Sequence, residues 1–243
     1  MRPPAAETAR ALVAERYPEA IQAWLAGSTT TGRATETSDL DITVLLDVGA
    51  EVHRESLEYD GWPVELFVHT AASIEFFVAK DLAQRHPTMA RLVASGVPLL
   101  GDSRSDGGAD VRRRCVEVLE RGPGPVPEAD LELMRYGLTD LLDDLVGAGS
   151  GAEATAVAIG VWRAAAELAL AAADTWQGTG KWLVRELREL DARHGTRLTD
   201  ELDDALHRAL DGDRQPLLTA AERVLDGCGG RYWAGLYRAA DLP

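Results

Sequence analysis

The chain has 243 residues, of which 40 are acidic and 25 are basic, giving a formal net charge of -15 at pH 7. An apolar fraction of 46% excludes a disordered chain, and the excess of acid disfavours a protein that binds a nucleic-acid backbone. Cys115 and Cys228 are too few for a zinc cluster or a disulfide framework. The most apolar stretch, 164–173, is short and contains Glu167, and the N-terminus has no apolar signal core. We therefore expect a soluble, cytoplasmic protein with no membrane partner and no nucleic-acid partner.

The first half of the chain predicts helices alternating with strands. Residues 6–15 have the pattern of an amphipathic helix, and residues 39–46 alternate between apolar and polar as a half-buried strand does. Asp60-Gly61 lies between two strand-like segments, 52–59 and 62–69, and this dipeptide is a strong signal for a β-hairpin. The remaining elements expected here are a strand at 20–26, helices at 73–83 and 88–95, a short strand at 97–100 and a helix at 110–120.

The chain changes character at residues 122–127, Gly-Pro-Gly-Pro-Val-Pro, a composition that neither a helix nor a central strand tolerates. Beyond it we expect only helices, joined by short loops as in a bundle, at 128–146, 152–174, 181–191, 199–210 and 215–225. The predicted fold is an α+β N-terminal domain, a mixed sheet with flanking helices, at 1–121. A linker at 122–127 and an all-α helical-bundle domain at 128–243 complete the chain.

The residues that indicate chemistry lie between positions 27 and 41. Asp39 and Asp41 are two positions apart on a strand, so their carboxylates project from one face, about 7 Å apart at the Cα atoms. They repel each other unless a cation lies between them, and Mg²⁺ prefers such oxygen ligands. Gly27 and Ser28 directly follow a strand, where backbone amides and a hydroxyl are suited to phosphate, and Ser38 adds a second hydroxyl. The pattern favours a nucleoside triphosphate with Mg²⁺ as the ligand.

A third acid, Glu65, lies mid-strand between two apolar residues, where a carboxylate needs a partner. If its strand lies beside residues 39–46, Glu65 joins the two aspartates as a metal ligand or as a general base. The alternative is structural, because a glutamate within a strand commonly pairs with a nearby arginine. His69 falls on the same strand face as Glu65, and we expect a supporting or surface role for it.

These residues resemble the signature of the nucleotidyltransferase superfamily related to DNA polymerase β. Leu25-Ala26-Gly27-Ser28, a ten-residue spacer, Asp39-Leu40-Asp41-Ile42 and then Glu65 follow the order of that signature. The form Gly-Ser-x₃-Gly-x₅-Ser-Asp-Leu-Asp is similar to the small bacterial branch that contains aminoglycoside adenylyltransferases and minimal nucleotidyltransferases. Many relatives carry arginine just before the loop glycine, where this chain has Thr31, and its own arginine follows as Arg33.

The resemblance implies a set of roles for the matching residues. Asp39, Asp41 and Glu65 are the catalytic acids and would bind metal, with two Mg²⁺ ions expected. Gly27, Ser28 and Ser38 would contact the phosphates of ATP, the implied co-substrate. The second half resembles the helical domain of aminoglycoside adenylyltransferases more loosely, through residues 176–182. There Lys181 opens a helix after a glycine-rich loop, and Lys181 and Arg185 are candidates for binding the nucleotide.

The first hypothesis is a nucleotidyltransferase that uses Mg-ATP to transfer AMP to a hydroxyl of a small, cationic molecule resembling an aminoglycoside antibiotic. A second keeps the chemistry but places the acceptor hydroxyl on a partner protein, as in antitoxin-like minimal nucleotidyltransferases. A third is a nucleotide-binding regulatory module without turnover. The large helical second half favours the first hypothesis over the second, and the retained third acid favours it over the third.

Overall fold

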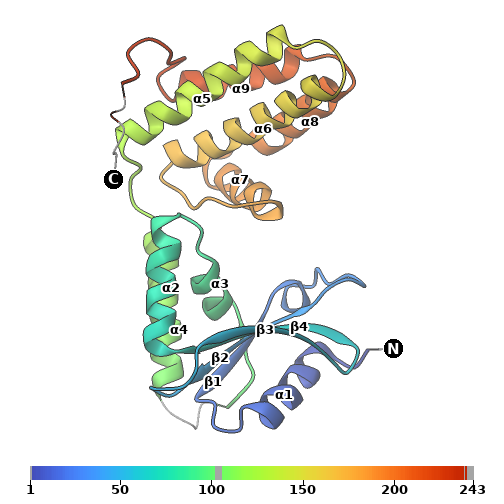
Figure 1. Ribbon diagram of the computed structural model, residues 1–243, viewed down its shortest axis with the longest axis vertical. Helices are drawn as coiled ribbons and strands as arrows, with labels where there is room; N and C mark the ends of the chain where they lie inside the picture. The colour runs from blue at the N-terminus through green and yellow to red at the C-terminus, as the bar shows by residue number, and fades with distance from the viewer. Residues whose placement is uncertain (1, 102–105, 238, 240–243) are drawn as a thin grey trace. The chain divides into compact units, whose positions relative to one another are not determined.

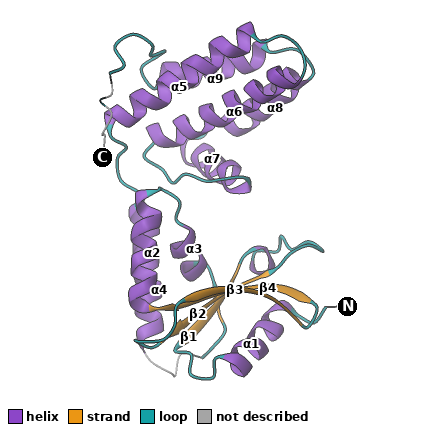
Figure 2. Ribbon diagram, viewed as in Figure 1, coloured by secondary structure: helices purple, strands orange, loops and turns teal. Residues whose placement is uncertain are grey.

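The computed structural model describes residues 2–101, 106–237 and 239 of the chain (Figure 1). It divides into two compact units, Met1–Gly122 and Pro123–Pro243, each with its own hydrophobic core. Within the described residues, all strands belong to the first unit, and the regular structure of the second is helical (Figure 2). The predicted fold class, a mixed-sheet domain followed by helices, is confirmed.

The first unit is built around one sheet. Within the described residues its strands are β1 (Gln22–Ala26), β2 (Leu40–Leu46), β3 (His53–Tyr59), β4 (Trp62–Thr70) and β5 (Val97–Pro98). Their order in the sheet is β3-β4-β2-β1-β5, and β2 and β4 run parallel whereas the other neighbouring pairs are antiparallel, so the sheet is mixed. They match the predicted strands except for small shifts at the ends.

Alternation along β2 divides the sheet into two buried faces. Ile42, Val44 and their even-numbered neighbours pack against helix α1 (Ala5–Arg16), which covers one face. Leu45 and Trp24 face the other side, where α2 (Ala71–Ala83), α3 (Thr88–Ala94) and α4 (Asp106–Arg121) form the second layer (Figure 1). Asp41 shares this second face with Leu45, because odd-numbered residues of β2 point to the same side.

Two local features fix the geometry of β4. Asp60 and Gly61 both have positive φ, 48° and 77°, as a two-residue type I′ turn requires, and the turn sets the register of β3 against β4. At the other end, Thr70 caps α2 in a capping box: its side chain accepts from the Ser73 N–H, and the Ser73 hydroxyl accepts from the Thr70 N–H. Strand β4 therefore passes into α2 without a loop, and α2 starts at the carboxyl end of this inner strand.

The second unit has a single core shared by α5 (Glu128–Gly147), α6 (Ala152–Ala172), α7 (Lys181–His194), α8 (Leu198–Leu210) and α9 (Gln215–Gly227). Helix α6 is central, since it contacts the other four. By length and composition α6 alone among the described helices would be apolar enough to cross a membrane, with a mean hydropathy of 1.4 over its best window. The apolar run is therefore longer than the 164–173 expected from the sequence, and its buried side chains belong to the core of the unit.

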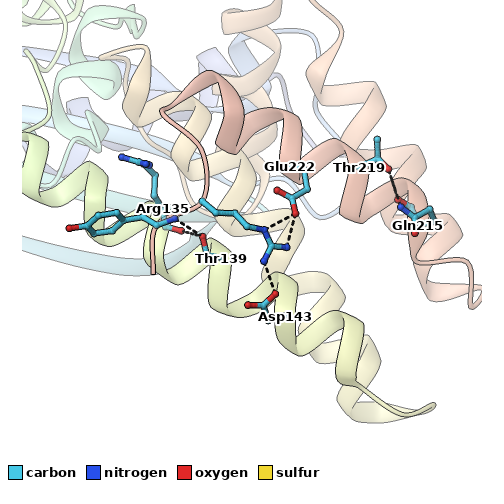
Figure 3. Close-up of polar contacts among 8 residues, drawn as sticks. Arg135, Thr139, Asp143, Gln215, Thr219 and Glu222 are labelled. Atoms are coloured by element: carbon cyan, nitrogen blue, oxygen red, sulfur yellow. Dashed lines mark hydrogen bonds and ion pairs between the residues drawn. The ribbon is translucent and has the colours of Figure 1, made fainter. Parts of the chain in front are cut away.

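The segment after α9 folds back along α5 and is held there by polar contacts. Arg231 donates to Glu222 of α9 at 2.6 and 2.8 Å and to Asp143 of α5 at 2.6 Å (Figure 3). These carboxylates, Glu222 first, raise the pKa of the Arg231 guanidinium. Arg135 donates to the carbonyls of Gly229 and Gly230, and so attaches the segment at a second point. Asp143 thus has a structural partner within its own unit.

Candidate active site

Three carboxylates meet at one end of the sheet, where the parallel strands β2 and β4 lie side by side. The register pairs Asp41 with Glu65, so the two side chains occupy neighbouring positions on the same face. Asp39 precedes β2 by one residue, and ligand atoms of Asp39, Asp41 and Glu65 all lie within 4.8 Å of one another. All three side chains are partly buried. The structure therefore brings together the three acids that the sequence selected.

Gly27 lies directly against this cluster. It follows β1, whose last residue Ala26 pairs with Asp41 across the antiparallel ladder. Its φ is 85°, and a Cβ placed on it would lie 2.4 Å from Oδ2 of Asp41. Any side chain at position 27 would displace that carboxylate, and the left-handed backbone would be strained as well. Glycine here allows the backbone to approach the acid cluster closely.

The loop between β1 and β2 is closed by the two predicted serines. Ser28 and Ser38 share a hydrogen bond between their hydroxyl oxygens at 2.8 Å, and the Thr35 N–H donates to Oγ of Ser38 at 2.8 Å. Ser38 is buried, whereas Ser28 is half-buried at the start of a short 3₁₀ turn, Ser28–Thr30. Ser38 therefore organises the loop in this structure, while Ser28 is the more accessible of the two hydroxyls. Arg2 supports the same loop from outside by donating to the Ser38 carbonyl at 3.2 Å.

Arg54 is the site residue that the sequence analysis did not identify. Its Nη2 donates to both carboxylate oxygens of Glu65, each at 2.7 Å, and its guanidinium lies over the Phe67 ring, 5.1 Å from the centroid. Glu65 is thus both paired with an arginine, as the structural alternative predicted, and a member of the acid cluster. The sequence does contain a signal for this contact. The Asp60-Gly61 turn fixes the register that places Ser56 opposite Glu65. Arg54 lies two positions from Ser56 and therefore on the same face of the strand.

His69 lies on the same face of β4 as Glu65, but it is buried, with 5% of its surface exposed. Its Nδ1 is 2.9 Å from the Ser73 hydroxyl, and its ring packs edge-on against Phe77. Burial lowers the pKa of His69 from 6.5 to about 4. The imidazole is therefore neutral at neutral pH and contributes packing and a hydrogen bond rather than charge, in line with the supporting role that we expected.

Lys181 and Arg185 lie in the second unit, on the first two turns of α7. Lys181 is exposed and is the first residue of the helix, after Gly180 with a φ of 53°. An ammonium group there adds to the partial positive charge of a helix N-terminus, an arrangement that costs helix stability and attracts anions. The Arg185 guanidinium lies over the ring of Trp182, 4.7 Å from its centroid. Their part in nucleotide binding stays a prediction.

The donor set of the acid cluster is suited to a hard divalent cation. Three carboxylates within 4.8 Å of one another repel, and an ion such as Mg²⁺ relieves this repulsion through oxygen ligands. The absence of a side chain on Gly27 lets the backbone of the loop lie directly against Asp41, so that its amides stand close to the same carboxylates. The hydrogen bonds from Arg54 to Glu65 compete with metal binding at that one ligand.

The comparison with protein families agrees with this geometry. Residues 7–87 match the family model for a nucleotidyltransferase domain, a range that contains the acid cluster and the loop after β1. The structure is similar to that of a nucleotidyltransferase-like protein from Exiguobacterium sibiricum 255-15, with 15% sequence identity and a TM-score of 0.41. That similarity covers 90% of this chain and 78% of the other. No match is found among curated proteins.

Proposed function

We propose that this protein transfers AMP from ATP to a hydroxyl group of a small cationic molecule, because residues 7–87 match the family model for a nucleotidyltransferase domain. The observation that carries the proposal is the acid cluster, with carboxylate atoms of Asp39, Asp41 and Glu65 within 4.8 Å of one another and Gly27 against Asp41. The net charge of -15 supports a cationic acceptor through long-range attraction.

In the proposed reaction the acceptor oxygen attacks the α-phosphorus of ATP. The bond from that phosphorus to the bridging oxygen breaks, pyrophosphate leaves, and the hydroxyl proton passes to a carboxylate. Asp39 and Asp41 would hold divalent cations, which when bound supply positive charge beside the phosphate oxygens. Ser28 and the backbone after Gly27 would position the phosphates. Lys181 and Arg185, in the second unit, stay predicted nucleotide-binding residues.

Glu65 has two candidate roles in this scheme. As a third metal ligand it would leave Arg54, whereas as a general base it would accept the proton from a hydroxyl held nearby. Either role has to compete with Arg54, which donates to both oxygens of this carboxylate.

The direct test is transfer of label from ATP carrying ³²P at the α-phosphate, with Mg²⁺ and a panel of aminoglycosides. We expect labelled acceptor and equimolar pyrophosphate, and no transfer from ATP labelled at the γ-phosphate. Asp41→Asn is expected to abolish transfer, whereas Asp47→Asn, an exposed acid just beyond β2, should retain it. If ATP binds but no acceptor on the panel is labelled, this acceptor class is wrong.

A second candidate, nucleotide binding without turnover, is favoured by one observation, the engagement of both Glu65 oxygens by Arg54. The same assay separates the two, because a silent module would bind ATP and Mg²⁺ yet release no pyrophosphate with any acceptor. Label found on a partner protein in place of a small molecule would instead support the antitoxin-like alternative.

A further inference from the structure

A cavity of about 310 Å³ lies in the first unit beside the acid cluster, between strands β3 and β4 and helices α2 and α3. Its volume falls in the range of small-molecule sites. The residues that line it include Arg54, Phe67, His69, Phe77 and Asp81. None of the roles given above explains why these residues surround an open space.

The cavity is the next feature along β4 from Glu65. Glu65, Phe67 and His69 alternate along the strand and share one face, so Phe67 follows Glu65 at a spacing of about 7 Å. Arg54 connects the two regions, because it lines the cavity, lies over Phe67 and donates to Glu65. The cavity therefore adjoins the Glu65 carboxylate through Arg54.

The order of the strands separates the cavity from the proposed phosphate loop. Gly27 and Ser28 follow β1, whereas the cavity lies at β3 and β4, and β2 with Asp41 runs between them. Nucleotide phosphates on the β1 side and a second substrate on the β4 side would therefore meet at the acids. This arrangement suits a direct transfer between two bound molecules.

The lining defines the chemistry of the occupant. Phe67 and Phe77 present aromatic surface to a ring, and His69 lies edge-on to Phe77 with their centroids 5.3 Å apart. Asp81 adds a carboxylate; its Oδ2 accepts from the Met89 N–H at 2.7 Å, and burial raises its pKa. The Met89 amide and the charges of His86 and Lys80 offset part of the cost of burying that carboxylate, and a cationic group in the cavity beside Asp81 would offset more of it.

We propose that this cavity is the acceptor site, which holds an amino-substituted ring with its ammonium group at Asp81 and a hydroxyl group directed to Glu65. The inference rests on the proposed function and deepens it by naming the residues that select the acceptor. Phe67 would contact the ring, and Asp81 would select for positive charge.

Binding separates this inference from the proposed reaction. We would titrate 2-deoxystreptamine and kanamycin, with myo-inositol as an uncharged ring, into the full-length protein by calorimetry without nucleotide. Wild-type protein is expected to bind at least one of the two amines and to bind it more tightly than inositol. Asp81→Asn should weaken that binding at least tenfold while Asp47→Asn leaves it unchanged, and Phe67→Leu, which keeps apolar volume without the ring, should weaken binding of the same amine.

Equal affinity of wild-type and folded Asp81→Asn protein for that amine, or no binding of either amine to wild-type protein, would overturn the inference. The transfer assay is then read separately: label transfer with an acceptor KM unchanged in Asp81→Asn leaves the reaction standing and removes this site from it. Amine binding that depends on Asp81, without label transfer to any acceptor, would retain the site and contradict the reaction. Circular dichroism of each variant establishes that its fold is intact.

Discussion

Arg54 and Glu65, on adjacent strands of the hairpin, form an ion pair in which one guanidinium nitrogen donates to both carboxylate oxygens at 2.7 Å. The two residues are unequally placed, since the Arg54 side chain is 61% exposed and that of Glu65 is 29% exposed. An exposed pair of this kind contributes about 0–1 kcal/mol to stability. The ion pair therefore affects the charge of the acid cluster more than it affects the stability of the fold.

Replacing Arg54 with leucine is expected to strengthen binding of a divalent cation about 3- to 10-fold. The substitution removes a positive charge and a competing partner from Glu65, and a tenfold change corresponds to about 1.4 kcal/mol of the interaction between these charges. Titration with Mn²⁺ followed by electron paramagnetic resonance measures the affinity. Arg54→Lys keeps the charge and should stay near wild type. Weaker Mn²⁺ binding in Arg54→Leu would instead mean that Arg54 orients Glu65 for the metal.

Gly27→Ala is expected to reduce Mn²⁺ affinity at least tenfold, because the added methyl group would lie 2.4 Å from Oδ2 of Asp41. Gly32→Ala is the matched control. Gly32 also has a positive φ, 69°, but an added Cβ there meets nothing within 4 Å. Both variants carry backbone strain, about 1–3 kcal/mol at Gly27, whose φ of 85° and ψ of -162° lie in a region essentially restricted to glycine, and about 1 kcal/mol at Gly32. Thermal unfolding detects this strain, and only the first variant should lose metal. Equal loss of Mn²⁺ binding in both would show that strain alone is responsible.

Because His69 is buried, we expect the protein to lose stability as the pH falls. Its pKa is about 4 in the folded protein against 6.5 in the unfolded chain, so below pH 6.5 the unfolded state takes up a proton that the folded state excludes. The neutral His69 imidazole therefore contributes roughly 3 kcal/mol to the free energy of unfolding. This contribution is fully present above pH 6.5, declines as the pH falls and is lost below about pH 4. Urea unfolding of wild type and His69→Gln at pH 7 and pH 4.5 measures it. The variant should lose less stability between the two pH values, and parallel losses would contradict the prediction.

Thr43→Val is expected to stabilise the first unit by about 1 kcal/mol. Thr43 is fully buried in β2, and its hydroxyl has no hydrogen-bond partner within the part of the chain that the structure describes. Removing an unsatisfied buried hydroxyl at constant shape recovers its desolvation cost. Thr139→Val provides the contrast, because the buried Thr139 hydroxyl donates to the Arg135 carbonyl and accepts from the Tyr232 N–H. Urea unfolding should therefore show a higher free energy of unfolding for Thr43→Val and a lower one for Thr139→Val.

Local patterns in the sequence determined most of the fold and the identity of the three acids. The spacing of Asp39 and Asp41 places them on one face because the side-chain period of a strand is two, and Asp60-Gly61 imposes its turn through backbone conformation alone. The helices beyond residue 127 follow from apolar periodicity, which depends only on neighbours along the chain.

Tertiary structure decided which groups the acids meet. The parallel pairing of β2 with β4, which places Asp41 opposite Glu65, joins segments that no local pattern connects. Burial of His69 and the cavity beside Phe67 depend on how α2 and α3 cover the sheet, so they follow from packing rather than from propensity. The contact of Arg54 with Glu65 depends on side-chain reach across the hairpin, and only the folded chain shows that one cation both lines the cavity and holds the third acid.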